Sequence, residues 1–318
     1  MKPRLSLATV LAVILAAVSL AVTAARLLPG DPHPHKVAHA KLPPRLASYL
    51  GVYEPQAPPG YGPIADFTNV AGGKPNLVEI FSGWAVPFIA AFANVLHQHG
   101  ITPLVQIDPT DASVAHIAAG TYDDYLHLYA EKVADFGHPV VIGFGHEMNA
   151  NGYSWGYGHV PPATFVAAWR HIVTLFRQAG ADNVTWLWTI QASGRGTGPP
   201  EAWWPGAGYV TWIGIDGFYY RPADTFATVF GRTIDDVRKF GKPVLLSETA
   251  VGAEADRFDK IINMFQGMIR YNTLGLVWFD VAQHAPPFHL DWRIEGDQAA
   301  ERAFQLAVKS YIPLPASP

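Results

Sequence analysis

Two glutamates stand where acid–base chemistry needs them, each at the end of an apolar run of the sequence. Glu147 comes three residues after the run 140–144, and Glu248 ends the run 243–248. A protonated carboxyl can donate its proton to the leaving oxygen of a glycosidic bond, while an ionised one can attack the anomeric carbon. The spacing of Glu147 and Glu248 therefore decides whether they can share one site.

The elements that must position the two glutamates recur along the chain. Eight short strand-like runs begin roughly 32 residues apart on average, and helical patterns separate most of them. The strand-like runs are 49–53, 77–81, 103–107, 139–144, 184–190, 212–218, 243–247 and 275–279. The helical patterns are 87–99, 122–136, 162–179, 233–240, 256–271 and 297–311. The first and fifth connections lack a clear long helix, so those two units are expected to be irregular.

Eight strand–helix units predict an α/β protein with a (β/α)8 TIM barrel over residues 45–318. An open doubly wound sheet is the alternative, but the count of eight and the missing glycine-rich turn after the first strand favour the barrel. Glu147 and Glu248 are 101 residues apart, about three repeats. Both should therefore lie on the carboxyl-end rim, with carboxyl groups about 5–5.5 Å apart as in a retaining glycosidase.

Other polar and aromatic side chains are expected on the same rim. Asp108, His146 and Asn149 follow strands, as do Tyr219 and Tyr220, one of which should hydrogen-bond the neighbouring Glu248. Pyranose rings present apolar C–H faces that pack on aromatic side chains, and the predicted loops are rich in such residues. The loop and rim aromatics are Trp84, Tyr153, Trp155, Tyr157, Trp203 and Trp204. About half of them are expected to be packing residues.

The segment 146–149, His-Glu-Met-Asn, followed by Tyr-Ser-Trp-Gly at 153–156, resembles the acid/base motif of glycoside hydrolase family 26. This family of retaining endo-β-mannanases and relatives has a (β/α)8 fold. The resemblance implies that Glu147 is the acid/base and Glu248 the nucleophile. The sequence departs from the family pattern at Gly143-Phe144-Gly145, where Arg-Pro is common, and at Thr249-Ala250, where an aromatic residue and glycine are common.

The resemblance also implies roles for residues around the glutamates. The histidine before the acid/base orients the sugar, the tyrosine after strand 6 contacts the nucleophile, and tryptophans stack on sugar rings; Tyr219 is preferred to Tyr220 for the tyrosine. Together with the rim residues, the predicted substrate-binding set is His146, Asn149, Trp155, Tyr219, Trp278, Trp84 and Asp108.

Composition excludes several other classes of protein. The chain has 318 residues, of which 49% are hydrophobic and 15% charged, and this predicts a large core rather than disorder. A net charge of −4 argues against a nucleic-acid partner, and the absence of cysteine removes disulfides and thiolate chemistry. The zinc-protease motif His-Glu-x-x-His fails because position 150 is alanine. No cofactor and no metal site are predicted: Asp108 and Asp280 could bind a cation, but the sequence favours ordinary polar residues of the barrel rim.

The first 44 residues are expected to lie outside the barrel. Lys2 and Arg4 precede an uncharged run from 5 to 25, which predicts a signal peptide or an uncleaved signal anchor over residues 1–25. Residues 26–44 are rich in proline and histidine and are expected to form a linker. The protein is therefore expected to be secreted, or tethered to a membrane through residues 5–25 and facing outside.

The sequence thus predicts a monomeric retaining β-glycoside hydrolase acting on a polysaccharide. A β-1,4-mannan is the first candidate, with mannan endo-1,4-β-mannosidase activity. β-1,3-Xylan, mixed-linkage glucan or an exopolysaccharide are alternative substrates. A non-catalytic glycan-binding or envelope polysaccharide assembly protein that has kept the barrel is the alternative from another class.

Overall fold

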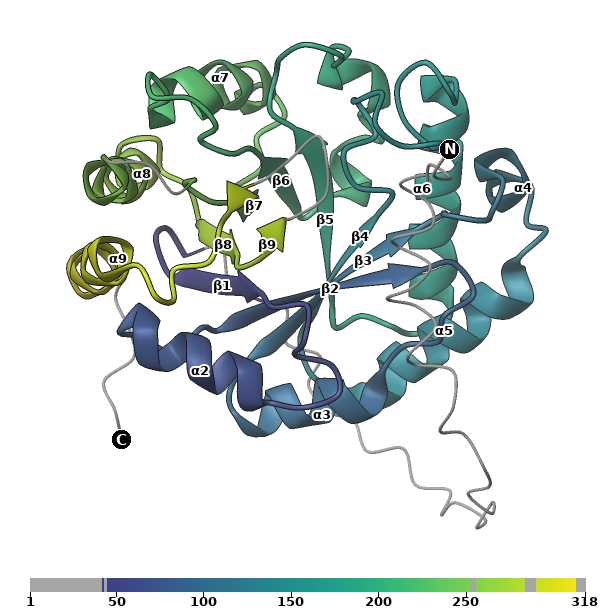
Figure 1. The fold of residues 1–318 in the computed structure, drawn as a ribbon. Coiled ribbons are helices and arrows are strands. Elements are labelled where there is room, and N and C mark those ends of the chain that lie inside the picture. Colours follow the sequence, from purple (N-terminus) through teal and green to yellow (C-terminus); the bar gives the residue numbers. More distant parts are fainter. Residues whose placement is uncertain (1–41, 43–44, 253–255, 284–289, 313–318) are drawn as a thin grey trace, which may run out of the picture. The chain divides into compact units, whose positions relative to one another are not determined.

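A closed barrel of eight parallel strands forms the centre of this computed structural model, which describes residues 42, 45–252, 256–283 and 290–312. These residues belong to one compact unit, 39–318. Each strand pairs with its sequence neighbours, and β8 closes the ring against β1 (Figure 1). The strands are β1 (Tyr49–Tyr53), β2 (Leu77–Gly83), β3 (Thr102–Asp108), β4 (Val140–Phe144), β5 (Val184–Gln191), β6 (Trp212–Asp216), β7 (Val244–Thr249) and β8 (Gly275–Phe279).

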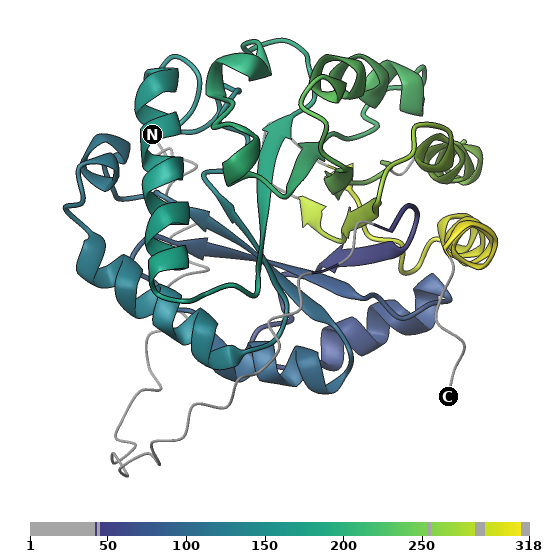
Figure 2. The same ribbon diagram turned by 180° about the vertical axis from the view of Figure 1, so that it is seen from behind.

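Helices surround the barrel on its outer side, and the view from behind shows the same ring (Figure 2). They are α2 (Gly62–Ala71), α3 (Ala90–Gln98), α4 (Val114–Ala118), α5 (Asp123–Phe136), α6 (Pro162–Gln178), α7 (Arg232–Arg238), α8 (Arg257–Arg270) and α9 (Gln298–Tyr311). Short turns η1 (Pro200–Trp203), η2 (Ala207–Tyr209) and η3 (Ala227–Gly231), and an antiparallel pair β9 (Ala282–Gln283) and β10 (Leu290–Asp291), complete the described elements. The predicted (β/α)8 barrel is confirmed.

The two connections that were expected to be irregular differ from each other. The fifth, between β5 and β6, contains the single turns η1 and η2 in place of a long helix. The first contains the helix α2, so its expected irregularity was wrong. Pro63 stands in the first turn of α2, and Ile64, Phe67 and Ala71 are buried at helical spacing. The glycines around Tyr61 hid this short pattern in the sequence.

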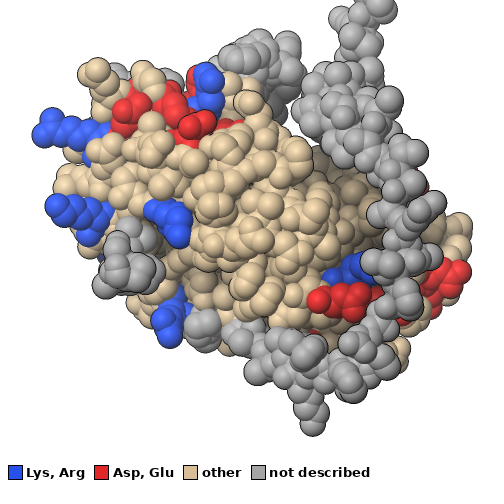
Figure 3. All heavy atoms as spheres, turned by 90° about the horizontal axis from the view of Figure 1, so that it is seen from below, with Lys and Arg blue, Asp and Glu red and all other residues tan. Residues whose placement is uncertain are grey.

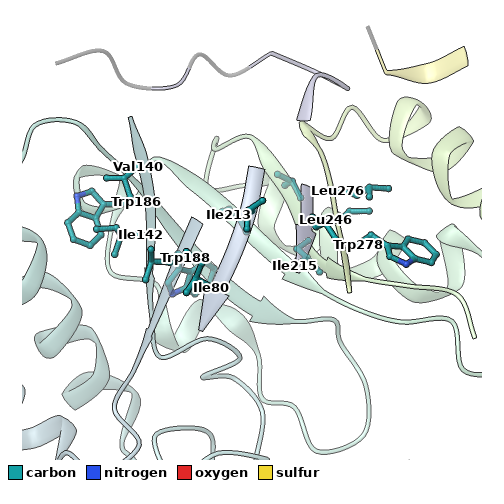
Figure 4. Packing of buried hydrophobic residues seen from close by; sticks show 14 of the residues in the cluster. Ile80, Val140, Ile142, Trp186, Trp188, Ile213, Ile215, Leu246, Leu276 and Trp278 are labelled. Atoms are coloured by element: carbon teal, nitrogen blue, oxygen red, sulfur yellow. The ribbon is translucent and has the colours of Figure 1, made fainter. Parts of the chain in front are cut away.

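Two apolar layers fill the unit. The outer layer lies between the strands and the helices, and Figure 4 shows side chains such as Trp186 and Trp278 leaving their strands on that side. The inner layer closes the amino-terminal end of the barrel. It consists of Tyr49, Leu77, Leu104, Val141, Leu187, Trp212, Leu245, Leu274 and Val277. Since alternate residues of a strand point to the same side, this layer fixes which later residues face inward.

A polar layer follows the inner apolar layer along the strands. Its members lie two or four residues beyond the apolar ones and are all buried: Glu79, Gln106, Thr189, Asp216 and Ser247. Two interior glycines give these side chains room. A Cβ at Gly143 would collide with Gln106 Oε1, and one at Gly214 would lie 2.5 Å from Ser247 Oγ and 2.7 Å from Thr189 Oγ1. The barrel therefore carries a polar floor directly beneath its carboxyl-end rim.

Surface charge and possible membrane-spanning helices are relevant to the predicted nucleic-acid and membrane contacts. On the face drawn in Figure 3, charged side chains of both signs are separated by broad uncharged areas. No helix within the described residues is long and apolar enough to cross a membrane. The predicted signal or anchor segment, 1–25, and the linker, 26–44, lie outside the described residues except for Leu42.

Candidate active site

The segment that follows β4 turns sharply and carries Glu147. Gly145 and Glu147 both have left-handed backbone conformations, with φ of 55° and 52°. Such a φ is unfavourable for a residue with a side chain, so the surrounding contacts must hold it. Glu147 N–H donates to the carbonyl of Thr189 on β5 at 3.1 Å, and its own carbonyl accepts from Ala150 N–H at 2.8 Å. The turn thus fixes the Glu147 backbone between two strands.

His146 carries the positive charge of the site. Its Nδ1 lies 2.8 Å from Oδ1 of Asp108 at the end of β3, and both side chains are buried. Burial opposes the charged ring. The charge and hydrogen bond of Asp108 outweigh that effect and, helped by the charge of Glu147, raise the pKa of His146 to about 9. At neutral pH an imidazolium therefore stands beside Glu147, and the Asp108 carboxylate orients it.

The Asn149 side chain joins the segment after β4 to β5 through two hydrogen bonds. Its Nδ2 donates to the Gln191 carbonyl at 2.9 Å, and its Oδ1 accepts from Gln191 N–H at 2.8 Å. The side chain is 1% exposed. The prediction that Asn149 binds substrate is therefore wrong, because its amide is buried and both of its ends hold backbone.

Tyr153, rather than Trp155, is the aromatic residue beside the two glutamates. Trp155 is only 4% exposed, its Nε1 donates to the His146 carbonyl at 2.9 Å, and Tyr153 stacks on it at 4.5 Å between ring centroids. Burial, and then the charges of Glu147 and Glu248, raise the pKa of Tyr153 well above its usual value. The predicted contact between Trp155 and a sugar is wrong, because the Trp155 ring is buried and packs against the ring of Tyr153.

Glu248 lies in a buried acidic environment on β7. Its Cα pairs with that of Asp216 on β6, and the side chain is 7% exposed. Burial raises the pKa of Glu248 well above its usual range, with further contributions from the charges of Glu79 and Glu147, while a hydrogen bond with Asp216 opposes this rise. The charge of Glu147 thus reaches Glu248 and adds to the rise in its pKa.

Glu79 and Asp216 are acidic residues of the polar floor that sequence reasoning missed. Ser247 O–H donates to Asp216 Oδ1 at 2.6 Å, and Gln106 Nε2 donates to Glu79 Oε1 at 3.2 Å. Burial above all raises the pKa of both carboxyls well above their usual range. Both residues interrupt otherwise apolar strands at inward-facing positions, and this was the signal that could have found them.

The tyrosine after β6 that approaches the glutamates is Tyr220. Tyr219 is fully buried on the outer side, where its hydroxyl donates to Asn263 Oδ1 on α8 at 3.1 Å. Burial, followed by the charges of Glu147 and Glu248, raises the pKa of Tyr220. The choice of Tyr219 was wrong by one residue, because inward-facing Asp216 places residues 218 and 220 on the same side.

On β8, too, the residue that faces the barrel mouth lies one position away from the predicted one. Trp278 is fully buried on the outer side, with Nε1 donating to the Trp292 carbonyl at 3.0 Å and its ring 5.0 Å from Phe304 of α9 (Figure 4). It cannot stack on a sugar in the barrel mouth, so that prediction was wrong. Phe279 faces inward instead and stacks on Tyr53, with ring centroids 5.1 Å apart.

Trp84 lies at the outer edge of the predicted rim. It is partly buried, and its ring packs against Tyr122, Tyr125 and Phe144, with ring centroids 5.1 to 6.2 Å apart. The structure therefore brings together Asp108, His146, Glu147 and Glu248 from the predicted set, and adds Tyr153, Tyr220, Glu79 and Asp216. This arrangement offers two carboxyls for acid–base or nucleophilic chemistry, flanked by aromatic rings.

Comparison with known sequences agrees with this arrangement. Residues 105–295, more than half of the chain, match glycosyl hydrolase family 26. Endoglucanase H of Acetivibrio thermocellus is 26% identical over 267 residues, which cover 79% of this chain and 29% of that protein. A beta-1,3-xylanase, TXYA, of a Vibrio species is 24% identical over 67% of this chain and 41% of that protein. The chain thus spans less than half the length of these curated relatives.

Solved structures share the fold. The Bacillus subtilis mannanase man26 superposes with a TM-score of 0.64 at 13% identity, covering 84% of this chain and 86% of that one. A Cellulomonas fimi endo-beta-1,4-mannanase double mutant gives a TM-score of 0.63 at 18% identity, covering 83% and 71%. Because the family match covers residues 105–295, more than half of the chain, this chain belongs to glycosyl hydrolase family 26.

Proposed function

We propose that this chain is a retaining β-glycoside hydrolase in which Glu147 is the acid/base and Glu248 the nucleophile. The observation that carries this proposal is the pair of glutamates, one in the segment after β4 and one on β7, each surrounded by different charged groups. Family membership supports the same reaction class.

The reaction proceeds by double displacement. A Glu248 carboxylate oxygen attacks the anomeric carbon while the bond from that carbon to the leaving oxygen breaks, and Glu147 gives its proton to that oxygen. The product of this step is a glycosyl ester of Glu248. In the second step Glu147, now a carboxylate, takes a proton from a water molecule whose oxygen attacks the anomeric carbon and releases Glu248.

The surroundings of the two carboxyls differ. Burial raises the pKa of Glu147, which favours the protonated form that a general acid needs, although the neighbouring His146 opposes the rise. A hydrogen bond with the Asp216 carboxyl opposes the rise that burial causes in the pKa of Glu248. That hydrogen bond favours the ionised form of Glu248 that a nucleophile needs.

The proposed substrate is a β-glycan, with β-1,4-mannan as the first candidate. The solved relatives described above are mannanases, whereas the sequence relatives are named as an endoglucanase and a beta-1,3-xylanase. The rings of Tyr153 and Tyr220 lie within the electrostatic reach of both glutamates and are the proposed contacts to the cleaved sugar. We also propose that the protein acts outside the cell, because Lys2, Arg4 and the uncharged run 5–25 have the pattern of an export signal or anchor.

Release of reducing sugar from a panel of β-glycans tests this function. The panel contains β-1,4-mannan, β-1,3-xylan and mixed-linkage glucan, each incubated with the full chain and its Glu147→Gln and Glu248→Gln variants. Release from one substrate that both variants lose, with folding intact by circular dichroism, is the expected result. Binding to a glycan without release by the unmodified chain would favour the non-catalytic alternative.

A further inference from the structure

Three carboxyl groups converge where β8 meets β1, outside the catalytic pair. Glu54 directly follows β1, Asp280 directly follows β8, and Glu295 lies in the segment before α9. One oxygen from each of the three lies within 4.8 Å of the other two. Asp280 is 1% exposed and Glu54 8%. Like charges this close and this buried repel one another unless something of opposite charge joins them.

Backbone donors satisfy only part of this group. Gln56 N–H donates to Glu54 Oε1 at 3.0 Å, and Ile294 N–H donates to Asp280 Oδ1 at 3.1 Å. The other oxygen of Asp280, Oδ2, is buried and accepts no hydrogen bond from the described residues, and the same holds for Glu295 Oε2. Buried polar atoms normally have a partner, so these two oxygens point to a group that belongs between them.

The contact between Asp280 and Glu295 narrows the identity of that group. One oxygen of Asp280 lies within 4.8 Å of one oxygen of Glu295. Two carboxylates offer only acceptors, so the approach is favourable only with a shared proton or a cation between them. The nearby Arg293 does not fill this place, because its Nε and Nη2 donate to Asp291 at 2.9 and 2.6 Å.

We propose that Glu54, Asp280 and Glu295 bind a divalent cation, and that Ca²⁺ is the ion that suits them. All three ligands are carboxylate oxygens, which hard cations prefer, and Ca²⁺ binds such oxygens at about 2.3–2.6 Å. One oxygen of each carboxyl lies within 4.8 Å of the other two, so a single ion can contact all three. Mg²⁺ requires shorter bonds of about 2.0–2.1 Å and a stricter octahedron. Water and backbone carbonyls would complete the Ca²⁺ shell.

The proposed ion is structural and takes no part in bond cleavage. Tyr53 and Phe279, whose rings stack in the barrel mouth, immediately precede Glu54 and Asp280. Trp292, three residues before Glu295, contacts the Tyr220 ring at 5.3 Å between centroids. An ion joining the three carboxylates therefore ties together the ends of β1 and β8 and the segment that carries Trp292. It fixes the aromatic side of the candidate active site.

Thermal unfolding of the full chain, stripped of metal with a chelator, tests the site. Ca²⁺ at about one hundred times its dissociation constant is expected to raise Tm by about 5–10 °C, with a smaller rise for Mg²⁺. Asp280→Asn and Glu295→Gln are each expected to abolish the rise while keeping Tm in chelator at or above that of the unmodified chain. The matched control is Glu131→Gln, which removes the same charge from an exposed position on α5 and should leave the Ca²⁺ response unchanged.

Isothermal titration of the metal-free chain with Ca²⁺ provides the second measurement. One binding event per chain is expected, absent from Asp280→Asn and from Glu295→Gln. The proposal is overturned if Ca²⁺ neither binds nor raises Tm, since a shared proton then joins the carboxyls. A response that persists in both variants would overturn it as well, because the ion would then bind elsewhere. Either failure leaves the proposed hydrolase activity standing, since reducing-sugar release is a separate readout.

Discussion

The buried ion pair of His146 and Asp108 is the residue-scale feature that sets the charge of the site. Three buried carboxyls, on Glu79, Asp216 and Glu248, and the half-buried carboxyl of Glu147 all have raised pKa values. The pKa of His146 is raised to about 9, so its ring carries a positive charge that stabilises the ionised form of nearby carboxyls. The pair therefore links the stability of the barrel mouth to its chemistry.

Stability should reveal this ion pair through its pH dependence. The pKa of His146 rises from 6.5 unfolded to about 9 folded, so its contribution is complete below about pH 6.5 and is lost as pH rises through about 9. Asp108→Asn should therefore lower the free energy of unfolding by about 3 kcal/mol near pH 6, and by much less above pH 9, in urea titrations. The matched control Asp123→Asn breaks the part-exposed pair with His171 and should cost about 1 kcal/mol or less at both pH values. Equal losses from Asp108→Asn at both pH values would contradict the charged pair.

Two adjacent tyrosines give a second residue-scale prediction. Tyr220→Phe should lower kcat/KM by about tenfold, because it removes a hydroxyl near both glutamates. Tyr219→Phe should leave kcat/KM unchanged and cost about 0.5–1.5 kcal/mol of stability, because it removes the hydrogen bond to Asn263. Steady-state kinetics and urea unfolding of the two variants measure both effects. If Tyr219→Phe lowers kcat/KM more than Tyr220→Phe does, Tyr219 rather than Tyr220 is the tyrosine that contacts the nucleophile.

At the scale of elements, the sequence predicted the strands better than it predicted the direction of their side chains. The bounds of β1 and β8 match the predicted runs, because both runs are apolar and end in clear breaks. Tyr219 and Trp278 were nevertheless assigned to the wrong side of their strands. A shift of one residue reverses the face of every side chain, and the irregular pairing of β7 with both neighbours is not visible in the sequence.

The polar floor gives the prediction at this scale. Gly143→Ala places a Cβ against Gln106 Oε1, so it should displace the floor and destabilise the barrel by about 1–3 kcal/mol. Catalytic activity should fall with it, because Gln106 also holds Glu79. Gly152→Ala is the matched control: its Cβ would meet nothing within 4 Å, and its stability should change by less than about 0.5 kcal/mol. Thermal unfolding of both variants measures the difference, and equal effects would contradict a tightly packed floor.

At the scale of the whole molecule, the repeat of eight units determined the fold, and the shared rim determined which loops meet. Both followed from the sequence because they depend on the order of elements rather than on single contacts. The same reasoning predicted that Glu147, Glu248 and His146 lie on the carboxyl-end rim, and their roles there stay predictions. Glu79 and Asp216 were missed, because burial inside a closed barrel depends on all eight strands together.

The pH profile of activity is the prediction that belongs to the whole molecule. The acidic limb of kcat/KM reports ionisation of Glu248 and the basic limb loss of the Glu147 proton. The closed barrel raises the pKa of both above the usual 4.5 of a glutamate, so both limbs should lie above that pH. Initial rates at low substrate concentration across the acid and neutral range measure the profile. An acidic limb at or below pH 4.5 would contradict the proposed burial of the nucleophile.

The most direct test of the central claim is to trap the glycosyl ester on Glu248. The full chain is incubated with a 2-deoxy-2-fluoro-β-glycoside of the sugar that it releases, and the labelled residue is located by peptide mass spectrometry. A mass increase of one glycosyl group on the peptide containing Glu248, absent from Glu248→Gln, is the result that double displacement predicts. Turnover of the natural glycan with no label on Glu248, or with the label on another residue, would contradict the assignment of the nucleophile.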